Sequence, residues 1–171
     1  MHPLKALLAS AALFLAPLTH AGEREFRAFF NDFEGRWQGR GQKTELQADG
    51  SRKTIDYTVK WDTDSGFDDT WDTQAESRTD SGTTSFSNTR FRIDGDNLYI
   101  SSNSPNDPAE ILENTETTLS WRSYRTDWVL RRTFVFVYKI EFTSRSEATY
   151  TETVTFNGKT IESQSAALKR R

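Results

Sequence analysis

Apolar and polar residues alternate along most of this chain after residue 35, with the two-residue period of a half-buried β-strand. In residues 54–61, for example, Ile55, Tyr57, Val59 and Trp61 take every second position. Turn signals separate such runs at Asp49-Gly50, 64–66, 80–82, Asp94-Gly95 and Asn157-Gly158, with a looser break over residues 103–108. A sheet of successive hairpins with one apolar face most simply closes on itself. We expect an all-β protein, a single antiparallel up-and-down β-barrel of about 8–10 strands.

Residues 23–34 have a helical period instead. Phe26, Phe29, Phe30 and Phe33 fall at positions i, i+3, i+4 and i+7, which gives a short helix one apolar face. Acidic residues at its start and Gly35 at its end fit the two termini of a helix. The pattern predicts a short N-terminal helix that caps the barrel.

The longest alternating run covers residues 128–143. One parity of this run contains Trp128, Leu130, Phe134, Phe136, Tyr138, Ile140 and Phe142, and Arg132 interrupts it. A two-residue turn at Asn157-Gly158 pairs Glu152 with Ser163 and Tyr150 with Ser165. If residues 150–156 also pair with the long run, Tyr138 lies near Glu152 and Phe136 near Val154.

These registers predict a polar group inside the barrel. The candidate ligand-binding residues are Arg132, Tyr138, Tyr150, Glu152 and Trp121. A buried guanidinium needs a partner, and the acidic group of a ligand could provide it. Alternatively, Glu152 or a backbone carbonyl pairs with Arg132, or Arg132 lies at the rim in contact with water. Replacing Arg132 by Leu separates these interpretations, because only an anchor for an acidic ligand loses binding.

The first 21 residues resemble an export signal. Lys5 precedes an apolar run over residues 6–15, and small residues near Ala21 suit cleavage. Pro17 and the shortness of the run argue against a membrane span, which needs about 20 apolar residues. We expect a periplasmic or secreted protein whose mature part, residues 22–171, is one domain.

Composition narrows the chemistry of this mature part. The two histidines, His2 and His20, and the only methionine, Met1, lie in the signal segment, and the chain has no cysteine. Most nucleophilic catalysis and transition-metal binding use these side chains, so we expect a non-enzyme without a cofactor. Removing Lys5 leaves 21 basic and 25 acidic side chains, a net charge of −4, which disfavours nucleic acid as a partner.

Acidic residues crowd one predicted turn, at Asp62, Asp64, Asp68, Asp69 and Asp72. Their spacing does not match a calcium loop, because Gly66 takes its fifth position and Thr73 its twelfth. We interpret this segment as a solvated turn and predict no metal site.

The segment Gly35-Arg36-Trp37-Gln38-Gly39-Arg40-Gly41 resembles the G-x-W motif of lipocalins and their calycin relatives. Its longer form, G-x-W-x-G-x-G, is similar to the first strand of nitrobindin-type and fatty-acid-binding-like barrels. In such a strand Trp37 can close the barrel floor against the phenylalanine face, and the missing side chains of Gly39 and Gly41 permit either sharp curvature or a close approach of other groups.

Two features near the chain end bear on this resemblance. Nitrobindin-type proteins hold haem through a histidine there, but residues 161–168 contain none, so haem is not expected. Tyr150 could ligate ferric haem or be a buried core tyrosine. The resemblance to lipocalins also implies that a basic residue of the last strand covers Trp37, with Lys169, Arg170 and Arg171 as the candidates, although a frayed basic tail would fit as well.

Several function classes remain. The first is a barrel that binds a small hydrophobic or amphipathic ligand, which could be acidic. The second is a self-filled barrel that acts through its surface as an interaction or envelope-maintenance protein. An enzyme would need Tyr, Glu or Asp as acid–base groups. An outer-membrane barrel is disfavoured by a mean hydropathy of −0.75 and by the basic end at residues 169–171.

Overall fold

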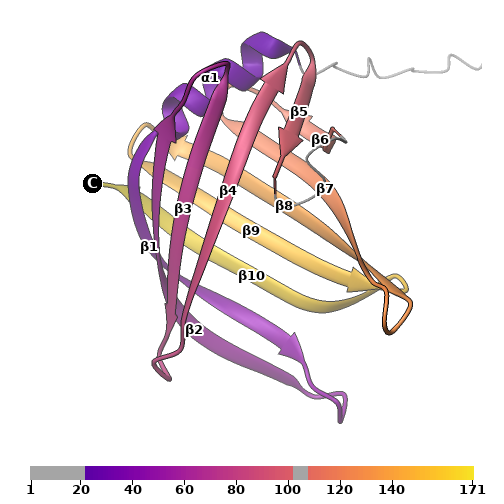
Figure 1. Ribbon diagram of the computed structural model, residues 1–171. Helices are drawn as coiled ribbons and strands as arrows, with labels where there is room; N and C mark the ends of the chain where they lie inside the picture. The colour runs from indigo at the N-terminus through magenta and orange to yellow at the C-terminus, as the bar shows by residue number, and fades with distance from the viewer. Residues whose placement is uncertain (1–21, 102–107) are drawn as a thin grey trace, which may run out of the picture.

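The computed structural model describes residues 22–101 and 108–171, which form a β-barrel with a short helix at one end (Figure 1). The elements are α1 (Glu23–Phe33), β1 (Gly35–Leu46), β2 (Arg52–Ser65), β3 (Thr70–Thr79), β4 (Thr84–Asp94), β5 (Asn97–Ile100), β6 (Glu110–Asn114), β7 (Thr118–Asp127), β8 (Arg132–Ser144), β9 (Glu147–Phe156) and β10 (Lys159–Arg170). The predicted signal segment, with His2 and His20, lies outside the described residues. So does most of the predicted break at 103–108.

The strands form one antiparallel sheet in the order β5-β4-β3-β2-β1-β10-β9-β8-β7-β6. Strands β1 and β10, the first and last along the chain, pair along their length. The two edges of the sheet are therefore β5 and β6, and the seam of the barrel lies between them. A bridge between Tyr99 and Pro108 joins these two edges, and the Ala109 amide donates to the Leu98 carbonyl at 2.7 Å. The predicted all-β up-and-down barrel is confirmed, with ten strands in the described residues.

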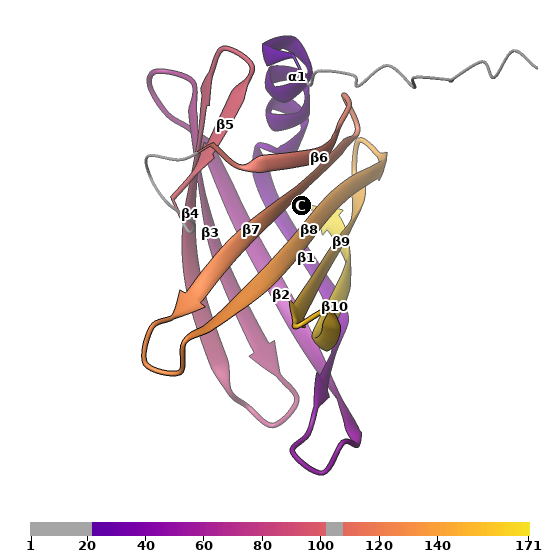
Figure 2. The same cartoon turned by 90° about the vertical axis from the view of Figure 1, so that its right-hand side faces the viewer.

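The connections between strands alternate between the two ends of the barrel. At the end away from α1 lie the β1–β2, β3–β4, β7–β8 and β9–β10 loops, and we call this end the mouth (Figure 2). The predicted turns at 49–50, 80–82 and 157–158 lie at the mouth, and those at 64–66 and 94–95 lie at the helix end. The turn signals in the sequence therefore mark real connections.

Helix α1 closes the end opposite the mouth. Its four phenylalanines, Phe26, Phe29, Phe30 and Phe33, are at most 1% exposed. The Phe30 ring stacks on Trp71 at 4.9 Å, and the Phe29 ring lies 5.0 Å from Phe142. Arg27 pairs with Glu23 on the helix and with Asp69 on the β2–β3 loop. The predicted capping helix is confirmed, and its apolar face is part of the core.

The tryptophan of the G-x-W segment lies directly beneath this helix. Trp37 is 1% exposed, and its indole Nε1 donates to the Phe33 carbonyl at 2.9 Å. Gly35 links helix and strand with a φ of +108°, where a side chain would be strained. Arg170 lies over the indole, with its Cζ atom 4.8 Å from the ring centroid. The expected cover of Trp37 by Arg170 is confirmed, because β10 continues in register to Arg170.

The other two glycines of the segment face crowded positions. A Cβ atom on Gly39 would overlap the Ala167 carbonyl, and one on Gly41 would meet both the Ser165 carbonyl and the Tyr57 ring. Of the two roles expected for these glycines, the structure shows a close approach of neighbouring groups.

The predicted register of the last hairpin is wrong beyond its turn. A β-bulge between Thr160 and Glu162 adds one residue to β10. Glu152 therefore pairs with Gln164 instead of Ser163, and Tyr150 pairs with Ala166. The predicted neighbours across β8 and β9 are confirmed, since Tyr138 pairs with Glu152 and Phe136 with Val154.

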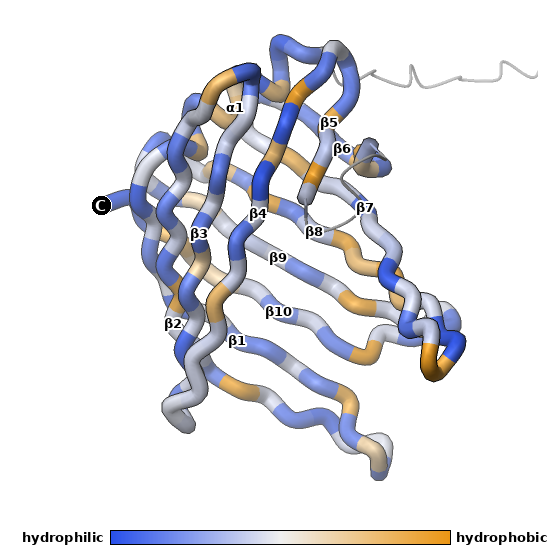
Figure 3. Tube along the Cα trace, viewed as in Figure 1, coloured by the Kyte–Doolittle hydropathy of each residue, from blue (hydrophilic) through white to orange (hydrophobic). Residues whose placement is uncertain are grey.

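The long apolar run is not one strand from its beginning, as its alternation predicted. Strand β7 ends at Asp127, and residues 128–131 form the β7–β8 turn. Asp127 Oδ1 accepts the backbone N–H groups of Val129 and Leu130, both at 3.0 Å, which fixes the turn. Trp128 and Leu130 therefore project from the mouth, where Figure 3 colours part of the loop as hydrophobic.

The acidic turn near the helix end is tied to neighbouring elements by arginines. Asp62 pairs with Arg36 at 3.2 Å, and Asp72 with Arg90 at 2.7 Å. In residues 22–101 and 108–171, no group of three or more His, Cys, Asp or Glu side chains is placed to hold a metal ion. Among these same residues, no helix has the length and apolar character to cross a membrane.

Candidate functional site

A cavity of about 300 Å³ lies inside the barrel, between α1 and the mouth. Phe33 and Phe91 line it toward the helix, and Arg125, an exposed residue near the end of β7, lines it toward the mouth. This volume is at the lower end of the usual range for small-molecule sites. The helix end of the barrel is thus filled by its own side chains, and the space toward the mouth is not.

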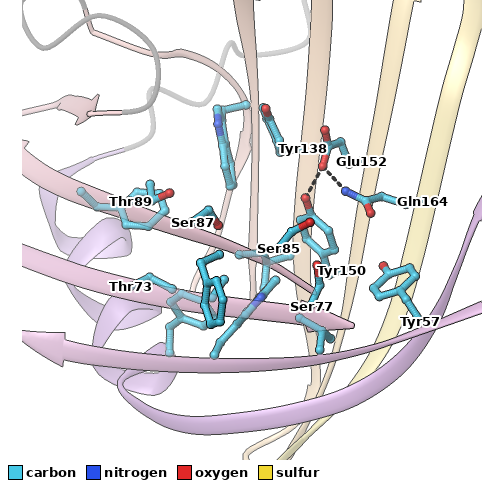
Figure 4. Close-up of a pocket in the computed structure, with 18 of the residues that line it drawn as sticks. Tyr57, Thr73, Ser77, Ser85, Ser87, Thr89, Tyr138, Tyr150, Glu152 and Gln164 are labelled. Carbon is cyan, nitrogen blue, oxygen red and sulfur yellow. Dashed lines mark hydrogen bonds between the residues drawn. The ribbon is translucent and has the colours of Figure 1, made fainter. Parts of the chain in front are cut away.

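Small side chains on two neighbouring strands create this space. On the inward face of β3 and β4, Ala75 pairs with Ser87 and Ser77 pairs with Ser85. Thr73 and Thr89 continue the same face toward the helix, and Thr73 shares a hydrogen bond of 3.0 Å with Thr63. Figure 4 shows these hydroxyl-bearing side chains on the wall facing Tyr150 and Glu152.

Aromatic rings line the rest of the cavity. Trp121, Tyr138 and Tyr150, on β7–β9, form the wall opposite the small residues, whereas Trp61 and Phe91 lie on β2 and β4. The Trp121 and Tyr138 rings stack at 5.0 Å, and the Trp61 and Tyr150 rings meet edge to face at the same distance. Phe91 meets the Trp121 ring edge to face at 6.0 Å. These contacts hold the rings in place, so the wall can accept the flat face of a ligand without first becoming ordered.

Glu152 is the acidic residue in the lining of this cavity. Its Oε2 atom accepts hydrogen bonds from the Tyr150 hydroxyl, at 2.5 Å, and from Gln164 Nε2 (Figure 4). The strand register explains the cluster, because Tyr138, Glu152 and Gln164 lie side by side across β8, β9 and β10. Both donors of Glu152 are neutral groups.

Three tyrosines around this carboxylate resist ionisation. Burial, aided by the negative charge of Glu152, raises the pKa of Tyr57 and that of Tyr138 to about 12. The same two causes raise the pKa of Tyr150 well above its ordinary value. The hydroxyls of this wall therefore keep their protons at neutral pH and can donate hydrogen bonds.

The structure brings together most of the residues that the sequence singled out. Trp121, Tyr138, Tyr150 and Glu152 line the cavity. Arg132 does not; it is exposed at the mouth, where its Cζ atom lies 5.4 Å from the Phe156 ring centroid. The reason is the turn at 128–131, which makes Arg132 the first residue of β8. Of the alternatives for Arg132, the rim position is the one observed.

Sequence reasoning missed the serines and threonines of β3 and β4, and also Tyr57, Gln164 and Arg125. Gln164 was missed because the bulge in β10 shifts it opposite Glu152. Tyr57 belongs to the inward parity of a strand that the alternation did identify, so that parity was a usable signal. Arg125 shares the inward face of β7 with Trp121 and Ser123, a period of two that could have been followed from Trp121.

The fold and the cavity define a class, that of up-and-down β-barrels with an internal space open toward one end. No protein-family model matches the chain, and no curated protein matches its sequence.

Solved structures do match the fold. The S-type phycobiliprotein lyase CPES from Guillardia theta has a TM-score of 0.62 at 12% identity, over 85% of this chain and 92% of the lyase. A protein of unknown function from the DUF3598 family of Nostoc punctiforme has a TM-score of 0.59 at 11% identity, over 83% of this chain and 49% of that protein. At such identities the similarity is one of fold.

Proposed function

We propose that this protein is an exported, lipocalin-like binding protein that holds a small apolar or amphipathic molecule in its barrel without catalysing a reaction. The main support for this proposal is the cavity of about 300 Å³. A barrel that acted only through its outer surface would be more stable with this space filled by its own side chains. Ordered aromatic rings on one wall and small hydroxyl-bearing side chains on the other suit a flat, partly polar ligand.

The calycin and nitrobindin-type resemblance of residues 35–41 belongs to this proposal. Haem does not, since Tyr150, the tyrosine that could ligate it, directs its hydroxyl to Glu152. Export is proposed from residues 1–21 and predicts that the protein recovered from the periplasm begins at Gly22.

Titration with the neutral fluorescent dye N-phenyl-1-naphthylamine tests the binding function. The variant Ser87→Phe places a ring in the cavity, whereas Asn88→Phe places the same ring on the outer face of the same strand. We expect Ser87→Phe to weaken dye binding at least about tenfold and Asn88→Phe to leave it unchanged. Equal binding by both variants would place the dye outside the barrel and contradict the proposal.

A further inference from the structure

The charges in the barrel interior are compensated at one place and uncompensated at another. Lys43, on the same face of β1 as Trp37, pairs with Glu45 and Glu162, both at 3.0 Å. Glu152 forms no ion pair with any lysine or arginine in residues 22–101 and 108–171. Its partners are a hydroxyl and an amide, and both bind the same oxygen, Oε2.

A carboxylate of this kind has acceptor capacity left. An ionised carboxylate has about four lone-pair sites on two oxygens, and Tyr150 and Gln164 use two of them. Hydrogen bonds to a charged acceptor are roughly twice as strong as those between neutral groups. Glu152 can therefore select a ligand group that carries an N–H or O–H donor.

The other charged residue of the cavity lining has the opposite sign and lies nearer the mouth. The Arg125 guanidinium is exposed, 5.1 Å from the centroid of the Phe136 ring, which holds it over the inner face of β8. Glu152 and Trp121 both pair with Tyr138, so they lie at the same depth in the barrel. Arg125 lies four residues further along β7 toward the mouth, so Glu152 is the deeper of the two charged residues. The cavity has an accepting inner region and a cationic entrance.

We propose, as a refinement that rests on the binding function above, that the ligand is a flat aromatic molecule of two unlike ends. An N–H or O–H donor at its inner end meets Glu152, and an acidic group at its outer end meets Arg125. Between these two ends, the aromatic part of the ligand lies beside the stacked rings of Trp121 and Tyr138.

Matched dyes test the inner end. N-phenyl-1-naphthylamine carries an N–H, and 1-phenoxynaphthalene has an ether oxygen in its place. We expect the wild type to bind the amine about tenfold more tightly than the ether, measured by competition, and Glu152→Gln to lose most of that difference. Glu141→Gln, which removes an exposed acid beside Lys139 on the outer face of β8, should retain it. If Glu152→Gln fails to fold, Glu152→Asp, which withdraws the carboxylate by one methylene group, should still reduce the difference.

A third dye tests the outer end. In 5-anilinonaphthalene-1-sulfonate the same ring system carries an acid on the ring away from the N–H. Arg125→Gln should weaken this dye several-fold and leave the neutral amine unchanged, whereas Arg122→Gln, on the outer face of β7 beside Glu110, should change neither.

The outcomes separate the two proposals. Equal binding of amine and ether, abolished by Ser87→Phe, would keep the binding function and overturn the assigned polarity of the ligand. Failure of every dye to bind would count against the binding function itself.

A second inference rests on a different feature, the β7–β8 loop at the mouth. Trp128, Val129 and Leu130 are 84%, 91% and 56% exposed, although the backbone that carries them is fixed by Asp127. Arg131 and Arg132 follow directly and form no ion pair within the described residues. Exposed apolar side chains on an ordered turn indicate a surface that is covered when the protein acts.

We infer that this loop docks on a lipid bilayer with anionic headgroups. A tryptophan and two aliphatic side chains suit the boundary between headgroups and acyl chains, and the adjacent arginines suit negative headgroups. Because the loop borders the mouth, docking would bring the cavity entrance to the lipid surface (Figure 2).

Flotation with lipid vesicles tests this inference. Residues 22–171 contain α1 and all ten strands and lack the apolar run at 6–15, which could bind lipid by itself. We expect this chain to float with vesicles containing about one third phosphatidylglycerol and to stay behind with phosphatidylcholine alone. Trp128→Ser with Leu130→Ser, or Arg131→Gln with Arg132→Gln, should abolish flotation.

Phe67→Ser is the matched control. Phe67 is 94% exposed on the β2–β3 loop at the helix end, so its removal should not change flotation. Equal flotation by the loop variants would overturn the inference. So would a wild-type dimer in solution that the loop variants convert to monomer, because the loop would then serve a second copy of the chain.

Discussion

Trp37 is the residue on which the helix end of the barrel depends. It hydrogen-bonds the last turn of α1, contacts the rings of Phe33 and Phe142, and is covered by Arg170. One side chain thus joins the helix, the first strand and the last strand. Its role could be predicted because the motif sits directly after a helix with one apolar face.

Replacing Trp37 by Ala should lower the free energy of unfolding by about 3–5 kcal/mol, since it removes a buried aromatic and leaves a cavity. Urea denaturation would measure the change. Trp128→Ala is the control, because Trp128 is 84% exposed and its loss should change stability by less than about 0.5 kcal/mol. Similar stabilities for the two variants would contradict the structural role of Trp37.

For single residues, the sequence pattern predicted the position of Glu152 correctly and that of Arg132 incorrectly. The alternation correctly placed Glu152 beside Tyr138, because strand parity follows from local sequence. It placed Arg132 on the same inward face, but a single aspartate, Asp127, turns the chain before Arg132 and leaves it at the rim. Such an Asx turn competes locally with strand extension, and the apolar residues after it gave no sign of a break.

At the scale of secondary structure, the barrel depends on the pairing of strands β1 and β10. Their pairing closes the sheet on one side, and the glycines of β1 allow the carbonyls of Ala167 and Ser165 to approach. The close packing at Gly41 also seats the Tyr57 ring, whose hydroxyl donates to the Ser165 carbonyl at 3.2 Å. Stability and cavity shape are therefore coupled through this pair.

Gly41→Ala should destabilise the protein by about 1–3 kcal/mol, because the new Cβ meets backbone that cannot move without shifting β10. Thermal unfolding would measure the loss. Gly22→Ala, where the Cβ meets only the flexible end of Glu25, is the comparison. An unchanged melting temperature for Gly41→Ala would show that the two strands are not so closely packed.

Among the strands, the feature that the sequence pattern did not predict is the β-bulge in β10. Ile161 looks like any inward residue of an alternating strand, yet the extra residue beside it moves Gln164 opposite Glu152. Bulges depend on contacts with both neighbouring strands, so a local pattern does not reveal them. The polar cluster of the cavity was therefore only half predicted.

For the whole molecule, the sequence predicted the architecture well and the internal space poorly. Turn signals and alternation gave the barrel, the capping helix and the approximate strand number. The cavity arises from small residues on β3 and β4 facing aromatic residues on other strands, a pairing across the barrel that only the closed sheet establishes.

Alkaline pH should destabilise the barrel through its buried tyrosines. In the folded protein the pKa values of Tyr57 and Tyr138 are about 12, against about 10 for the unfolded chain. The folded state holds these two protons more tightly than the unfolded chain does. The contribution of the protonated tyrosines to the free energy of unfolding is therefore complete below pH 10 and is lost as pH rises toward 12.

Denaturation curves at several pH values would show this decline, and a variant with Tyr57→Phe and Tyr138→Phe should show a smaller one. Tyrosinate absorbance that develops fully before the barrel unfolds would be inconsistent with this burial.

Native mass spectrometry of the protein purified from the cells that make it tests most directly whether the barrel is a binding protein. We expect a stoichiometric small molecule on the wild type, released on denaturation and absent from Ser87→Phe. An apo mass for the wild type that persists after incubation with N-phenyl-1-naphthylamine would contradict it and favour a barrel that acts through its surface.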